Sequence, residues 1–161
     1  MEISNNQLKI LSALITKTDL FDLEEKIEIL TSLLGKIDTN YEAQIKAVLD
    51  NDSYDALTKD FQDLNLKLNS STDLEKYLNL IKEKVQSFKF LKLTLAINAS
   101  EELVETISYW ITKNIGQMVL IDLNFDKSII AGGLIEYEGK YKDFSIKSKL
   151  EKYFKINPAL I

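Results

Sequence analysis

The sequence predicts a mainly α-helical protein, in which an N-terminal helical bundle is followed by a small α+β domain of β-α-β-β-α order. Two observations support this fold class. Up to residue 88, apolar side chains recur at steps of three and four, the period of helices with one buried face. Beyond it, the apolar runs are short and partly alternating, and three of the five glycines lie within residues 132–139. We therefore expect two domains, residues 1–88 and residues 89–161.

The N-terminal half predicts four or five amphipathic helices with short connections, the pattern of a helical bundle. Capping boxes mark two of the helix starts, one at Thr39 with Glu42 and one at Thr72 with Glu75. The polar run 51–53 is expected to interrupt the helical pattern between them. The apolar stripes place the helices near residues 4–17, 20–35, 39–49, 54–68 and 74–88.

The C-terminal half predicts a small sheet with helices packed on it. The expected elements are strands at residues 90–97, 118–125, 134–137 and 141–144, and helices at residues 100–114 and from 146 onward. Gly139 and Lys140 are expected to form the tight turn between the last two strands. Gly132 and Gly133 precede that hairpin, where missing Cβ atoms permit positive φ or a close backbone approach. The pair matches neither glycine-rich phosphate-binding pattern, so a role in backbone geometry is favoured.

Composition excludes several classes of function. The chain has no histidine, cysteine or arginine, which removes His-based acid–base catalysis, cysteine nucleophiles and arginine phosphate clamps. Zinc sites depend largely on the same residues, and we expect no metal or other cofactor. The net charge of −5 argues against nucleic-acid binding, which needs a basic face. Because no apolar run approaches the ~20 residues that span a bilayer, and the N-terminus lacks signal-peptide features, we expect a soluble protein, at most peripheral to a membrane.

Two groups of carboxylate residues are spaced as a catalytic pair or a metal site could be. Glu136 and Glu138 lie two residues apart on a predicted strand and would share a face, as a catalytic pair could. Asp122, Asn124 and Asp126 could offer oxygen ligands to calcium, but the glycine and late glutamate of an EF-hand are missing. Solvated and alternating strand positions explain both patterns better.

Two features are candidates for a protein interface. Tyr109 and Trp110 adjoin on a predicted helix, and aromatic residues are enriched at interfaces; we expect Trp110 in the core and Tyr109 at the surface. Lysines are frequent near the C-terminus, where Lys147 and Lys149 flank the last helical stripe. A solvated face is the simpler interpretation of these lysines. Contact with an acidic helix of a partner is the more specific one.

The C-terminal half resembles a known family. An acidic residue, a Ser-Ile segment, a Gly-Gly pair, an apolar strand, a Gly turn, Asp-x-Ser and a terminal helix follow in that order. Over residues 90–154 this resembles the delta subunit of F-type ATP synthases, called OSCP in mitochondria. The matching positions are Asp126, Ser128, Ile129, Ile130, Gly132, Gly133, Gly139, Asp143, Ser145 and Leu150. The chain departs from the family with an extra Ala131 and with Lys127 in place of proline. Phe144 replaces a glycine, so we expect the turn before the last helix to differ there.

The resemblance implies a non-catalytic peripheral-stalk (stator) subunit that links the catalytic head of ATP synthase to the b-subunit stalk. It implies that the N-terminal bundle binds N-terminal helices of alpha subunits and that the C-terminal domain binds the C-terminal ends of b subunits. The place implied is the cytoplasmic face of a bacterial cell membrane, or the equivalent organelle face. The N-terminal half is short for the family and lacks a clear match to its first-helix motif. The alternative is a helical adaptor or regulatory domain unrelated to ATP synthase.

Overall fold

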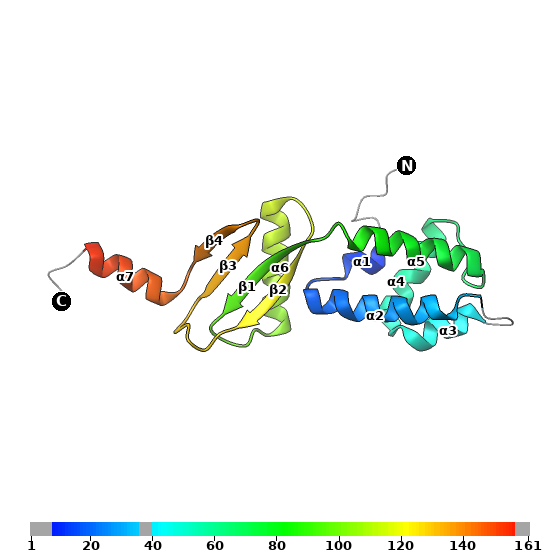
Figure 1. Ribbon diagram of the computed structural model, residues 1–161, viewed down its shortest axis with the longest axis horizontal. Coiled ribbons are helices and arrows are strands. Elements are labelled where there is room, and N and C mark those ends of the chain that lie inside the picture. The colour runs from blue at the N-terminus through cyan, green and yellow to red at the C-terminus, as the bar shows by residue number, and fades with distance from the viewer. Residues whose placement is uncertain (1–7, 36–39, 157–161) are drawn as a thin grey trace. The chain divides into compact units, whose positions relative to one another are not determined.

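The computed structural model describes residues 8–35 and 40–156 (Figure 1). The chain forms two compact units: Ile15–Lys17 belongs with the part from Lys89 onward, and the residues before and after that segment, to Phe88, form the other unit. The first unit is helical and the second contains the sheet. The predicted class, mainly α with N-terminal helices followed by a small α+β part, is confirmed. Within the described ranges, no helix is both long and apolar enough to cross a membrane.

Helices of the first unit bury one apolar face each. The elements are α1 (Lys9–Ser12), α2 (Lys17–Leu33, in this unit from Thr18), α3 (Tyr41–Val48), α4 (Asn51–Asp63) and α5 (Ser71–Val85). Their core includes Leu11, Leu30, Ile45, Leu57, Phe61, Leu74, Tyr77 and Ile81. The rings of Phe61 and Tyr77 meet edge to face at 4.7 Å between centroids, an arrangement that the aromatic quadrupole favours.

Asp60 is a buried carboxylate inside this apolar core, only 1% exposed. Its oxygens accept bonds from the backbone N–H groups of Lys9 (2.7 Å) and Ile10 (3.2 Å) and from the hydroxyl of Tyr77 (2.8 Å). Burial and the neighbouring Asp60 carboxylate raise the pKa of Tyr77, so this hydroxyl stays a donor. Leu8, the N-cap of α1, gives no side-chain cap bond, and Asp60 therefore satisfies the free N–H groups at the start of α1.

Several predicted helix starts are displaced. Asn40 caps α3 by accepting from the N–H of Ala43 (3.1 Å), while Thr39 lies outside the described residues. Ser70 caps α5, so the predicted cap Thr72 is inside the helix. Asp50 caps α4, so the run 51–53 is the first turn of that helix and not an interruption.

The predicted helix 4–17 is wrong at half of its described residues, Leu8 and 13–16. Lys9–Ser12 is helical, and α2 begins at Lys17. Between them, Thr16 forms a parallel β-bridge with Ile121 of the sheet. The physical reason is that this stretch pairs with a strand edge rather than closing its own helical hydrogen bonds; residues 4–7 lie outside the described part.

The second unit is a four-stranded mixed sheet with one helix packed on a face. Its elements are β1 (Lys89–Leu95), α6 (Glu101–Ile115), β2 (Val119–Phe125), β3 (Gly133–Tyr137), β4 (Lys140–Asp143) and α7 (Ile146–Ile156). The strand order is β2-β1-β3-β4, with β1 parallel to β2 and the other two pairs antiparallel. The core between sheet and α6 consists of Leu91, Leu93, Val104, Ile111, Val119 and Ile121.

The hairpin turn between β3 and β4 lies one residue earlier than predicted. Glu138 (φ 48°) and Gly139 (φ 73°) are its two central residues. Positive φ at both positions defines a type I′ turn, whose twist matches that of the paired strands. Lys140 is therefore the first residue of β4 and not part of the turn.

Candidate interaction surfaces

One end of the sheet gathers six segments of the second unit. The carboxyl ends of β1 and β2 meet there because the two strands are parallel. The loop after β2 is joined to β1 by two bonds, from the N–H of Asp126 to the carbonyl of Leu95 (2.9 Å) and from the N–H of Ala96 to the carbonyl of Gly132 (3.2 Å). The end of β4, the start of α7 and the first turn of α6 lie at this same end (Figure 1).

The glycine pair makes this junction possible. Gly132 has φ +92°, and a Cβ there would stand 2.5 Å from the carbonyl oxygen of Phe144. A Cβ on Gly133 would stand 2.8 Å from a methyl of Leu95 and 2.9 Å from the carbonyl oxygen of Thr94. Real Cβ atoms do not approach so closely, so the close backbone approach expected for this pair is present. Without it, the loop after β2 could not lie against both β1 and the start of α7.

Two aspartates fix the loop ends by the same kind of hydrogen bond, in which the carboxylate accepts from the N–H two residues later. Asp126 Oδ1 accepts from the N–H of Ser128 (2.8 Å), and Asp143 Oδ1 accepts from the N–H of Ser145 (2.7 Å). Hydrogen bonds from the serine side chain and backbone lower the pKa of each carboxyl. Ser145 is buried, and its Oγ accepts from the N–H of Ser148 (3.2 Å) at the start of α7. These bonds set where the loop leaves β2 and where α7 begins.

Phe144 occupies its position without backbone strain. Among the described residues, the non-glycine positions with positive φ are Asn65 and Glu138. The N–H of Phe144 bonds to the carbonyl of Gly133 (2.9 Å), which continues the β3–β4 ladder by one residue. Glycine is required at Gly132, which lies against the backbone of Phe144 and has no room for a Cβ.

Large apolar side chains remain uncovered at this end of the sheet. We call them the strand-end surface: Ile97, Phe125, Ile130, Phe144 and Ile146, each between 43% and 73% exposed. Ile130, one of the family positions, is the most exposed of them. Large apolar side chains exposed at one end of a domain are typical of a surface that a partner covers. The surface is therefore a candidate binding site.

The helix α7 extends this apolar character. Leu150 lies one turn beyond Ile146 on the same helical edge, and both are more than two-fifths exposed. The predicted interface residues Lys147 and Lys149 are exposed beside that edge. The positive charge of Lys152 and Lys147 further lowers the pKa of Asp143. This combination suits an amphipathic partner with acidic flanks.

The expectation for Trp110 is wrong. It is 59% exposed, next to Tyr109 at 70%. A helix on a sheet buries a narrow stripe, here Val104 and Ile111, and Trp110 is about 100° of helical turn away from Ile111. Lys113 Nζ lies 6.0 Å from the centre of the Tyr109 ring, a cation–π contact on the solvent side of α6.

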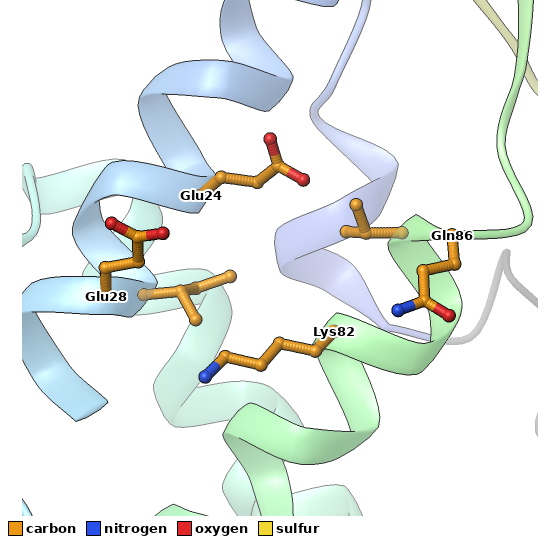
Figure 2. A pocket seen from close by; sticks show the side chains of 6 residues that line it. Glu24, Glu28, Lys82 and Gln86 are labelled. Atoms are coloured by element: carbon orange, nitrogen blue, oxygen red, sulfur yellow. The ribbon is translucent and has the colours of Figure 1, made fainter.

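A groove in the first unit is a second candidate, and periodicity did not predict it. It lies between α2 and α5 and has a volume of about 310 Å³. Figure 2 shows Glu24 and Glu28 on the α2 side and Lys82 and Gln86 on the α5 side. The buried side chains of Ile27 and Val85 complete the lining. The groove forms only when two helices distant in sequence become neighbours, so no local signal could reveal it.

In the structure, a carboxylate of each pattern forms an ion pair with a lysine. Glu138 lies in the hairpin turn and forms an ion pair with Lys89, so it is not a second strand position beside Glu136. Asp122 pairs with Lys17 at 3.4 Å. No group of three or more carboxylates within residues 8–35 and 40–156 could hold a metal ion.

Comparison with known proteins agrees on one family. The family model of the ATP synthase delta (OSCP) subunit matches residues 6–156, which covers both units. ATP synthase subunit delta of Thermosipho africanus is 35% identical over 60 residues, 37% of this chain and 33% of that protein. The Thermosipho melanesiensis subunit is 32% identical over 68 residues, 42% of the chain and 38% of that protein. The chain thus spans about a third of the length of these two relatives. The Rickettsia typhi subunit is 28% identical over 142 residues, 85% of the chain and 74% of that protein.

Proposed function

Because this chain belongs to the ATP synthase delta (OSCP) subunit family, whose members are non-catalytic subunits of that complex, we propose that it is a stator subunit joining the catalytic head to the peripheral stalk. A linking role needs two separate binding surfaces. The observation that carries the proposal is that each compact unit offers one, the α2–α5 groove in the first and the strand-end surface in the second.

The stalk side of the proposal uses the second unit. The strand-end surface and the apolar edge of α7 would bind the C-terminal ends of b subunits. Exposed apolar residues such as Ile130 and Ile146 supply buried area on binding. Lys147 and Lys149 beside them favour acidic residues on the partner helix. The glycine pair and the two aspartate turns support the surface from behind, as positioning residues that need not touch the partner.

The head side of the proposal uses the first unit. The α2–α5 groove would accept an N-terminal helix of an alpha subunit, a recognition mode in which apolar anchors enter a groove between helices. Ile27 and Val85 form the buried apolar floor of the groove. Glu28 and Lys82 on opposite sides offer ion pairs that would fix the direction of the bound helix.

The resulting role is mechanical. A stator holds the head against the torque of the central shaft, so that rotation is converted into conformational change at the nucleotide sites of other subunits. Such a protein carries no catalytic residue of its own. It would lie on the membrane through the complex, on the cytoplasmic face of a bacterial cell membrane or the equivalent organelle face.

Calorimetry with two peptides tests both halves of the proposal. One peptide is the N-terminal helix of the alpha subunit from the same organism, and the other is the C-terminal end of its b subunit. We expect Ile146→Glu to abolish binding of the b peptide and leave the alpha peptide unchanged. Lys82→Glu should do the reverse, so each variant is the control for the other. Absence of binding of both peptides to the unmodified protein would contradict the proposal.

A further inference from the structure

The sheet of the second unit includes a segment that is remote in sequence. Ile15–Lys17 lies between α1 and α2, yet it belongs with the residues from Lys89 onward. Thr16 forms a parallel β-bridge with Ile121, and the N–H of Ile121 donates to the carbonyl of Ile15 (2.9 Å). The segment thus adds an isolated β-bridge to the outer edge of β2.

Side chains reinforce this backbone pairing. Ile15 packs against the core cluster that contains Ile121. Lys17 Nζ lies 3.4 Å from Asp122 Oδ2 and 5.8 Å from the centre of the Phe90 ring. Lys17 and Asp122 are each about one third exposed, so solvent screens this ion pair only in part. Three consecutive residues therefore give three different kinds of contact to one strand edge.

An edge strand needs such protection. β2 is the last strand of the sheet on its side, and the outer N–H and C=O groups of an edge strand are ready to pair with other chains. The bridge falls at Ile121, in the middle of β2, and Ile121 itself is fully buried. The segment covers the edge at the position where β2 contributes most to the core.

We propose that the outer edge of β2 is a strand-docking site whose occupant is the chain's own Ile15–Lys17, and that the second unit is a discontinuous folding unit completed by this segment. Because Lys17 is also the first residue of α2, undocking of the segment and fraying of the first turn of α2 are coupled. The inference concerns folding and is independent of which partners the protein binds.

Amide hydrogen exchange on the full chain tests this inference. Ile15→Asp places a carboxylate against the apolar cluster, in a position outside any helix. We expect the amide of Ile121 to exchange about tenfold faster or more, together with the amides of the first turn of α2. Ile97→Asp, at an exposed position of the same unit, is the matched control and should leave Ile121 unchanged. Exchange at Ile121 within about twofold of the unmodified protein in Ile15→Asp would overturn the proposal.

A second set of variants applies if Ile15→Asp fails to fold. Lys17→Met keeps the aliphatic stem and removes the ion pair together with the contact of Nζ with the Phe90 ring. Asp122→Asn keeps the shape of the carboxyl and removes the ion pair alone. We expect each to speed exchange at Ile121, and the double variant to be no faster than the faster single one, because both remove the same interaction. No effect of either single variant, or effects that multiply in the double variant, would show that the pair does not hold the segment.

Discussion

In each unit, one residue meets a requirement of backbone geometry or hydrogen bonding that the helices and strands do not meet themselves. Gly132 is required because two backbone segments touch where a Cβ would stand. Asp60 is required because α1 begins inside the core without a cap of its own, and a buried N–H without an acceptor is strongly unfavourable. Neither residue belongs to a proposed binding surface, yet each positions the element next to it.

The glycine requirement can be measured against a glycine in open space. Gly132→Ala should lower the free energy of unfolding by about 2–4 kcal/mol, because the new Cβ meets Phe144 and the left-handed backbone is strained. Gly139→Ala has similar φ but meets no atom within 4 Å, and should cost only about 1 kcal/mol. Urea denaturation of the two variants gives the comparison; equal losses would contradict the close approach.

The buried aspartate has a matched exposed control three residues away. Asp60→Ala leaves the N–H groups of Lys9 and Ile10 and the hydroxyl of Tyr77 without their acceptor, and should cost about 3 kcal/mol or more. Asp63→Ala removes only the exposed ion pair with Lys9, and should cost less than about 1 kcal/mol. Thermal and urea unfolding would measure both losses, and comparable values would mean that Asp60 does not anchor α1.

At the scale of elements, helix caps and amphipathic edges decide what each helix can do. Asp50 caps α4 and also pairs with Lys26 of α2 at 2.7 Å, which ties two helices of the first unit together. By contrast, α7 leaves the apolar edge of Ile146 and Leu150 open. A capped and paired helix supports the fold, whereas an uncovered edge is available for binding.

The cap at Asp50 predicts a pH dependence. Its bond with the Lys26 side chain, followed by that from the N–H of Ser53, lowers the pKa of Asp50 below the ordinary value of 3.8. A lowered pKa means that the folded state resists protonation, so this contribution to stability is present above the ordinary value and is lost as the pH falls below it. Asp50→Asn keeps a cap without the charge.

The stability difference between the unmodified protein and Asp50→Asn should therefore be largest near neutral pH and shrink as the pH is lowered. The effect should be small, because the carboxyl is about half exposed. Urea titrations at several pH values would measure it. A difference that stays constant or grows toward acid pH would contradict the assigned cause.

Sequence reasoning predicted the elements better than their ends. The change of period placed the strands and helices of the second unit within a few residues, because each pattern is local. The N-caps of α3 and α5 differ from the predicted ones because Asn40 and Ser70 are at least as favourable in this position as the threonines near them. The segment Ile15–Lys17 was assigned to a helix because its pairing with β2 is non-local and leaves no trace in the periodicity.

The same limit applies to the candidate sites. The glycine pair was visible, since glycines are scarce in this chain and cluster before the hairpin. Trp110 was assigned to the core because its apolar character extends the helical stripe, although the sheet covers only part of that stripe. The α2–α5 groove needed the fold, because its two sides come from helices that only packing brings together.

At the scale of the whole molecule, each of the two units provides one of the two proposed binding surfaces. The helical unit carries a groove with carboxylates on one side and a lysine on the other, and the sheet unit carries an apolar surface with lysines beside it. These surfaces differ in chemistry, so they should select different partners. Two unlike surfaces, one on each compact unit, are what the proposed linking role requires.

The most direct test of this account is a bridging measurement. The purified alpha–beta head and the soluble part of the b subunit from the same organism would be mixed with and without this protein and separated by size. We predict that b elutes with the head only when the protein is present, and that Ile146→Glu and Lys82→Glu each abolish the joint complex while retaining one partner. Failure of the unmodified protein to bring b and the head together would contradict the stator role.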